Sequence, residues 1–222
     1  MSGRAIVLSG GMLEEAFIRK YLAEHTYDTL IAAEGGASFC LRNGLVPDLA
    51  VGDFDTAGSA LADQLESEGI SVERYPSRKD EPDTAIALSA AFSYHPSEVV
   101  IFGATGTRQD HFIANLAMLG RAAEDPETAC IPVILMDAHN RISVHTAPFE
   151  VPGECAAYPY VSFFAFSEKV TGLELKGFSY PVSDFTLHRT DVIGTSNYLT
   201  EKNAFVGFDS GVLIMACAGD KE

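Results

Sequence analysis

Tryptophan is absent from the 222-residue chain, and basic residues are few, with 15 lysines and arginines against 31 acidic residues. The resulting net charge of −16 argues against a surface for nucleic acid or anionic membranes, because such surfaces need positive charge. The longest apolar runs, at 131–136 and 211–218, fall short of the roughly 18 residues that span a bilayer. The apolar stretch near the N-terminus is likewise too short for a signal-peptide core. We therefore expect a cytoplasmic protein with no nucleic-acid or membrane partner.

Cysteine is also scarce, and no two cysteines form a C-x-x-C pair. Their neighbours are apolar, as in Ala216-Cys217-Ala218 and Cys130-Ile131, which predicts that most of them are buried small side chains rather than parts of a disulfide framework or a structural zinc site. Hydrophobic residues make up 47% of the chain and charged residues 21%, which is ordinary for a folded globular protein with its own core.

The pattern of apolar residues changes near residue 140. Before it, short apolar runs such as Thr29–Ala33 and Glu98–Phe102 alternate with helix-period segments, which predicts a parallel sheet of about six strands with flanking helices. After Asn140, alternation with period two predicts an all-β unit. Within that unit, Asp209-Ser210-Gly211 is typical of a hairpin turn, here between strands predicted at 203–208 and 211–216.

Most polar or glycine clusters of the first part follow directly after a predicted strand. In an open parallel sheet, ligands bind at the carboxyl ends of the strands, so these clusters should converge on one edge. The clusters are Gly10-Gly11, Glu34-Gly35-Gly36, Asp53 with Asp55, Arg78-Lys79-Asp80 and Gly103–Asp110.

Gly52-Asp53-Phe54-Asp55 places two carboxylates two residues apart in a loop after a strand. Hard Mg²⁺ suits such a pair, because it prefers oxygen ligands and usually takes one or two carboxylates together with substrate phosphates. The alternative is a solvated turn in which Asp55 or Thr56 caps the next helix.

The segment from Arg78 to Asp83 allows two interpretations. Asp83 comes directly before a predicted helix, so it can simply be an N-cap. Alternatively, Asp80 and Asp83 extend the acidic cluster while Arg78 or Lys79 meets phosphate oxygens.

A glycine-rich turn runs from Gly103 to the start of a predicted helix at His111. Such a turn lets backbone N–H groups approach phosphate, and Arg108 adds a bidentate fork. Asp110 can also be a cap, and His111 a capping or packing residue. Gly10-Gly11 is interpreted chiefly as a tight turn, and the polar residues 194–198 as a hairpin loop in the absence of other information.

Together these motifs resemble the thiamine pyrophosphokinase family over nearly the whole chain. The resemblance rests on their order and spacing, since none of them is decisive alone. The matching stretches are Ala33-Glu34-Gly35-Gly36-Ala37, Pro47-Asp48 with Gly52 to Thr56, Asp80 to Asp83, Gly103 to His111 with Asn115, Thr171–Leu173, Gly177–Pro181 and Thr195–Asn197.

The resemblance implies a Rossmann-like α/β domain at 1–139 that binds ATP and Mg²⁺, and a β-sandwich at 140–222 that binds thiamine and forms a homodimer. It implies that the pyrophosphoryl group of ATP moves to the hydroxyl of thiamine. The implied catalytic carboxylates are Asp53, Asp55, Asp80 and Asp83, with Mg²⁺ on Asp53, Asp55 and Asp83; ATP would contact Gly35, Arg78, Lys79, Gly103, Thr105, Arg108 and Asp110, and thiamine would contact Glu34, Ser196 and Asn197.

The chain departs from the family pattern at several positions. Glu34 stands where the family usually has aspartate, Pro82 replaces a threonine, and Ala85 stands where bacterial members often have glutamate. A degenerate nucleotide- or thiamine-binding protein is therefore one alternative function. A phosphatase of the haloacid-dehalogenase type, with Asp53 as the nucleophile, is another, although it leaves Gly103–His111 and the all-β part unexplained.

Overall fold

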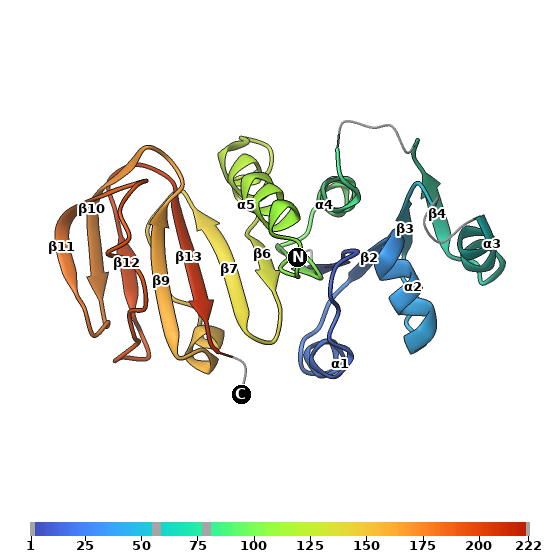
Figure 1. The fold of residues 1–222 in the computed structure, drawn as a ribbon, viewed down its shortest axis with the longest axis horizontal. Coiled ribbons are helices and arrows are strands. Elements are labelled where there is room, and N and C mark those ends of the chain that lie inside the picture. The colour runs from blue at the N-terminus through green and yellow to red at the C-terminus, as the bar shows by residue number, and fades with distance from the viewer. Residues whose placement is uncertain (1–2, 55–58, 77–80, 221–222) are drawn as a thin grey trace. The chain divides into compact units, whose positions relative to one another are not determined.

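The computed structural model describes residues 3–54, 59–76 and 81–220 and divides the chain into two compact units (Figure 1). The first unit comprises residues 1–118 and 135–138, and the second comprises 119–134 and 139–222. The division falls within α5 (Gln109–Glu124) and β6 (Val133–Met136). None of the described helices is long and apolar enough to cross a membrane.

Parallel strands form the centre of the first unit, as the sequence predicts. Their order is β4-β3-β2-β1-β5, and each neighbouring pair runs in parallel. The inner strands are buried on both faces, which is why they are continuous apolar runs without alternation. The strands are β1 (Arg4–Leu8), β2 (Thr29–Ala33), β3 (Leu49–Gly52), β4 (Ser71–Arg74) and β5 (Glu98–Phe102).

The strand order reverses once, and this reversal positions the site. From β1 to β4 each crossover moves in the same direction, and the chain then returns to place β5 beside β1. Because crossovers are right-handed, the returning helix lies on the opposite face, and Figure 1 shows α4 across the sheet from α1. The ends of β1 and β5 therefore form a switch point, where open α/β sheets bind ligands. The helices before β5 are α1 (Glu15–Glu24), α2 (Glu34–Asn43), α3 (Ser59–Ser67) and α4 (Asp83–Ser93).

Two antiparallel sheets form the second unit and share one core, which agrees with the predicted β-sandwich. In one layer the strand order is β7-β13-β9, the last three strands of a nine-stranded sheet, and the other layer is a four-stranded sheet with the order β11-β10-β12-β8. Alternate residues of β9 and β13, such as Phe163 and Met215, pack with Val170 and Leu173 of β10. The elements are β7 (Asn140–His145), β8 (Phe149–Glu150), the 3₁₀ helix η1 (Gly153–Ala157), β9 (Tyr160–Ala165), β10 (Lys169–Lys176), β11 (Val182–His188), β12 (Phe205–Gly207) and β13 (Leu213–Ala218).

The prediction of a hairpin around Asp209-Ser210-Gly211 is wrong. Strand β12 pairs with β10 and β8, whereas β13 pairs with β7 and β9, so the turn carries the chain from one sheet to the other. The turn is instead bonded to β10, since the N–H of Asp209 donates to the carbonyl of Thr171 at 2.8 Å and the N–H of Thr171 to that of Ser210 at 3.0 Å. Turn residues specify a chain reversal but not the partner of the next strand.

Three of the four cysteines are buried, as predicted, and Cys130 is exposed. Burial raises the pKa of Cys40 to about 12, so its thiol stays protonated at any ordinary pH.

We expect the reduced native protein to take up one equivalent of a thiol-disulfide reagent at pH 8, at Cys130, and four in denaturant. A Cys130→Ser variant should take up none before denaturation. More than one equivalent in the native wild type would contradict the burial of the other thiols.

Candidate functional site

A cavity of about 790 Å³ lies at the carboxyl ends of the parallel strands in the first unit. Its wall combines the loops after β1 and β5 with residues near the beginnings of α2, α4 and α5. The lining residues are Ser9, Gly10, Gly11, Met12, Ala33, Glu34, Gly35, Ser38, Pro82, Asp83, Thr84, Gly103, Ala104, Gly106, Thr107, Arg108, His111 and Asn115. The predicted convergence of separate glycine and acidic clusters on one edge is therefore observed for these segments.

Close backbone contacts hold the cavity's glycine loops together. The N–H of Gly11 donates to the carbonyl of Gly103 at 3.0 Å, and a Cβ on Gly11 would come within 2.3 Å of that oxygen. A Cβ on Gly35 would lie 2.6 Å from the Cα of Gly10. The sequence interpretation of Gly10-Gly11 as chiefly a tight turn did not include this role. A pair of glycines directly after the first strand was the available signal.

Two buried polar contacts brace the same wall and were not anticipated. The hydroxyls of Ser9 and Thr84 lie 2.5 Å apart, which ties the end of β1 to the first turn of α4. The buried side chain of Asn115 on α5 donates from Nδ2 to the carbonyl of Ala104 at 2.8 Å and so holds the glycine-rich turn. Serine and threonine are too common in loops for the sequence to single out this pair.

Two acidic side chains line the site, and each belongs to the first residue of a helix, Glu34 of α2 and Asp83 of α4. Glu34 and Asp83 line the cavity, and Glu34 is only 6% exposed. A Cβ on Gly52 would lie 3.5 Å from Glu34 Oε2, so the Glu34 carboxylate borders the end of β3, directly before Asp53. The predicted site residues Asp55, Arg78, Lys79 and Asp80 lie outside the described residues.

The backbone is strained beside Asp53. Phe54 is buried, at 2% exposure, and has a φ of 56°. A bulky aromatic residue rarely adopts this left-handed conformation, which costs of the order of 1–3 kcal/mol and is typical of functional loops. The buried ring of Phe54 thus anchors the loop that carries Asp53.

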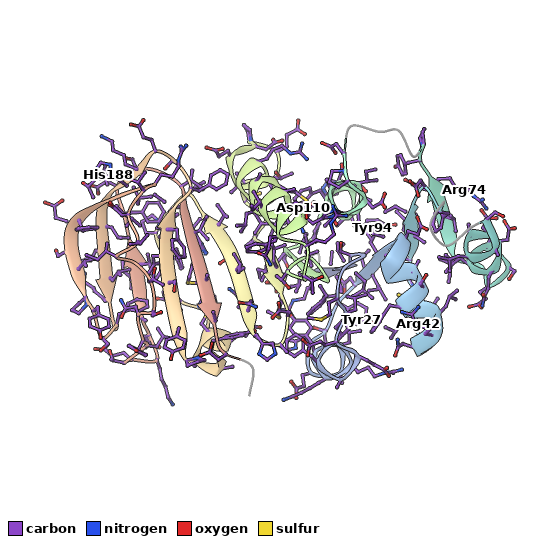
Figure 2. The ribbon with its side chains drawn as sticks, in the orientation of Figure 1. Tyr27, Arg42, Arg74, Tyr94, Asp110 and His188 are labelled. Atoms are coloured by element: carbon purple, nitrogen blue, oxygen red, sulfur yellow. The ribbon has the colours of Figure 1, made fainter. Side chains whose placement is uncertain are left out.

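Arg108 brings positive charge to the cavity wall. Its Nη2 donates to Asp110 Oδ2 at 2.5 Å, and both side chains are exposed. The hydrogen bond from Arg108 lowers the pKa of Asp110, which is labelled in the first turn of α5 in Figure 2. Arg108 therefore has a carboxylate partner two residues further along the chain, in the first turn of α5.

Two other predicted residues have structural partners in this unit. The hydroxyl of Thr105 donates to Asp137, and within the described residues neither Thr105 nor Asp110 belongs to the cavity wall.

Asp83 is not an N-cap, so that alternative is wrong: α4 begins at Asp83, and its N-cap is Pro82, whose side chain cannot cap. Asp83 instead stands in the first turn, where a carboxylate is favoured by the helix dipole.

The remaining candidates, Ser196 and Asn197, lie in the second unit. Ser196 is exposed and has a φ of 58°. Asn197 is only 5% exposed, and its carboxamide is bonded to the backbone of Tyr180 and Tyr198.

The cavity can hold both an anion and a cation. The first turns of α2, α4 and α5 contribute to or adjoin its wall, and unpaired N–H groups at helix starts attract phosphate. The carboxylates of Glu34 and Asp83 and the nearby Asp53 are hard oxygen donors, which suit a divalent cation. The fold and cavity thus define an α/β unit with a cavity at a switch point, followed by a β-sandwich.

Comparisons with known proteins identify the family. The model of the thiamin pyrophosphokinase catalytic domain matches residues 20–131, and that of the thiamin pyrophosphokinase vitamin B1 binding domain matches 148–213. Thiamine pyrophosphokinase from Bacillus subtilis is 31% identical over 205 residues, 90% of this chain and 91% of the relative. The chain belongs to the thiamin pyrophosphokinase family, which supports thiamine pyrophosphokinase activity.

Solved structures agree with this assignment. Thiamine pyrophosphokinase from Bacillus subtilis superposes with a TM-score of 0.82 at 26% identity, covering 98% of this chain and all of that one. A thiamin pyrophosphokinase family protein from Enterococcus faecalis also gives 0.82, at 27% identity, covering 99% of this chain and all of that one. Thiamin pyrophosphokinase from Candida albicans, at 16% identity, shares the fold with a TM-score of 0.79, covering 99% of this chain and 90% of that one.

Proposed function

We propose that the protein transfers the pyrophosphoryl group of ATP to the hydroxyl of thiamine, yielding thiamine pyrophosphate and AMP. The observation that carries this proposal is the cavity at the switch point, with glycine loops, helix starts, carboxylates and Arg108 on one wall. The matches to both family domains support the choice of substrates.

The triphosphate of ATP would lie against the glycine loops at Gly35 and Gly103. A Cβ on Gly35 would clash with Gly10, and one on Gly103 would clash with Leu13, so the absence of side chains lets these segments pack together at the cavity wall. Backbone N–H groups held there could meet phosphate oxygens. Arg108 would exchange its contact with Asp110 for phosphate oxygens and so neutralise part of the charge.

The described carboxylates fit Mg²⁺ as a cofactor. Glu34 and Asp83 of the cavity wall supply oxygen donors, whereas Asp53 is not part of that wall and follows the end of β3 that borders Glu34. Among the described residues, no group of three acidic, histidine or cysteine side chains could hold a metal by itself. Mg²⁺ commonly takes one or two carboxylates and completes its shell with phosphate oxygens and water. The bound ion would neutralise and orient the triphosphate. Asp55 and Asp80 stay predicted contributors on the sequence alone.

The transfer is an in-line substitution at the β-phosphorus. The thiamine hydroxyl oxygen forms a bond to the β-phosphorus, the bond from that phosphorus to the oxygen shared with the α-phosphate breaks, and AMP leaves with that oxygen. The hydroxyl proton is released. Such reactions depend mainly on positioning and charge neutralisation, which the cavity wall can supply.

We also propose a homodimer, which light scattering on the purified protein would test.

Product analysis of purified protein with ATP, Mg²⁺ and thiamine tests this function. Equal amounts of AMP and thiamine pyrophosphate, dependent on Mg²⁺, are expected. Binding of thiamine or ATP without turnover would favour the degenerate binding protein. Release of free phosphate without thiamine would point to the phosphatase alternative.

Replacing Arg108 by alanine should raise the KM for ATP by roughly tenfold or more, because a charge-assisted contact to phosphate is lost. Arg42→Ala is the matched control: Arg42 is exposed in the last turn of α2 and labelled in Figure 2. Steady-state kinetics at saturating thiamine measures both. An unchanged KM in Arg108→Ala would make this arginine structural.

A further inference from the structure

Two buried cysteines of the second unit lie in contact with each other. The thiol of Cys217 on β13 donates to Sγ of Cys155 in η1 at 2.6 Å, and both residues are fully buried free thiols. Disulfide formation would bring the two sulfur atoms closer by only about half an ångström. The two residues are 62 positions apart in the chain, so the fold and not a local sequence motif brings them together.

A buried cation lies beside these sulfur atoms. Arg141 on β7 is paired with Cys217 across the two strands, so both side chains point to the same face of the sheet. Only 5% of the Arg141 side chain is exposed, and its Nε donates to Glu154 Oε2 at 3.3 Å. The hydrogen bond from Cys217 and the positive charge of Arg141 lower the pKa of Cys155, whereas the same sulfur contact raises the pKa of Cys217. Cys155 is therefore the thiol that ionises first, while Cys217 keeps its proton.

The turn that carries Cys155 is suited to brief local opening. The 3₁₀ helix η1 has five residues, of which only Cys155 is buried. Two of its backbone hydrogen bonds stay within the turn, from the N–H of Cys155 to Pro152 at 2.9 Å and from the N–H of Tyr158 to Cys155 at 3.1 Å. Cys217 instead lies in a strand that is paired on both sides, with β7 and β9 (Figure 1). Short surface segments open more readily than core strands, so a small oxidant would reach Cys155 when η1 opens.

We propose that Cys155 and Cys217 are an oxidisable pair, which hydrogen peroxide converts into a disulfide that ties η1 to β13. The Cys155 thiolate attacks one peroxide oxygen, the O–O bond breaks, and a sulfenic acid forms on Cys155; the released hydroxide and the proton lost by the thiol make the first water. Sγ of Cys217 then bonds to Sγ of Cys155, the S–O bond breaks, and the hydroxyl leaves with the Cys217 thiol proton as the second water. The two thiols lose two electrons, which the peroxide takes up, and a thiol reductant regenerates both thiols.

The disulfide would stabilise the second unit. It would close the chain between positions 62 apart, a stretch that includes β9 to β13, and closing a long loop restricts the unfolded chain. Oxidised protein should therefore melt about 10 °C higher than reduced protein. Equal melting temperatures for the cross-linked and the reduced form would contradict this stabilising role.

Thiol counting tests the pair in the Cys130→Ser variant, which lacks the exposed thiol. In denaturant this variant should show three thiols before peroxide treatment and only that of Cys40 afterwards. Dithiothreitol should restore all three, and peptide mapping without reduction should link the peptides of Cys155 and Cys217. Modification of Cys130 in the wild type establishes that the treatment is effective. The experiment uses no substrate, so its outcome does not depend on the proposed function.

Two serine variants in the Cys130→Ser background separate the pair from an effect of burial alone. Cys40→Ser removes a buried thiol of the first unit and should leave the cross-link unchanged. Cys217→Ser removes the second sulfur, so Cys155 should stop at the sulfenic acid, which a cyclic diketone traps. Circular dichroism establishes that each variant is folded.

Arg141 variants test how the pair is activated. Arg141→Gln should slow cross-linking roughly tenfold, because a smaller fraction of Cys155 is ionised. Arg141→Lys, which keeps the charge, should restore most of the rate. Equal rates in wild type and folded Arg141→Gln would contradict activation by this arginine.

Two results would overturn the oxidisable pair itself. One is a count of three thiols in Cys130→Ser after a treatment that modifies Cys130 in the wild type. The other is the loss of the Cys155 and Cys217 thiols without a cross-linked peptide, which would mean that each sulfur is oxidised separately.

Discussion

Replacing Asp83 by asparagine is expected to lower kcat for thiamine-dependent AMP release by roughly two to three orders of magnitude. Asparagine keeps the shape of the side chain but removes the negative charge that the proposed Mg²⁺ site requires. Asp83 is the first residue of α4 and lines the cavity, so the loss of its negative charge acts where the triphosphate is proposed to bind. Coupled detection of AMP over a range of Mg²⁺ concentrations measures the effect. The same expectation applies to Asp55→Asn from the sequence alone.

The control for Asp83→Asn is Asp63→Asn. Asp63 pairs with exposed Arg74 at 3.2 Å, and exposed ion pairs of this kind contribute little to stability. Its turnover should match that of the wild type. If the Asp83→Asn variant has wild-type turnover and an unchanged Mg²⁺ requirement, Asp83 is not part of the metal site. Its carboxylate would then only stabilise the start of helix α4. Partial recovery at high Mg²⁺ would strengthen the metal role.

The sequence predicts the α/β half of the fold better than the β half. Strands such as Thr29–Ala33 and Glu98–Phe102 agree to the residue, because a buried parallel strand is a bounded run of apolar residues. Strand β11 (Val182–His188) was not predicted, since only Leu187 of it is fully buried and the alternation is weak. The pairing of β12 and β13 depends on contacts between residues far apart in the chain, which a local turn signal does not contain.

The features of the candidate site likewise fall into those that the sequence predicts and those that only the structure reveals. Topology alone places the chain segments that follow β1, β2 and β5 at one edge, so Glu34, Gly35, Gly103 and Arg108 could be grouped from the sequence. The contact between Ser9 and Thr84 depends on the precise approach of α4 to β1 and carries no sequence signature. Asn197 is the opposite case: its motif was evident, but only the structure reveals that its carboxamide is engaged by backbone groups.

Replacing Gly36 by alanine is expected to lower the free energy of unfolding by about 3 kcal/mol or more, because helix α2 packs against β1 at this glycine. A Cβ there would lie 2.0 Å from the backbone carbonyl oxygen of Leu8, in a central strand that cannot move without disturbing its neighbours. Gly44→Ala, at the other end of the same helix, is the control. Gly44 has open space around it but a φ of 63°, so alanine there should cost about 1 kcal/mol. Urea unfolding of both variants gives the two values. Equal destabilisation would mean that α2 and β1 do not approach as closely as the structure shows, and Glu34 at the start of α2 would lose its fixed place at the cavity.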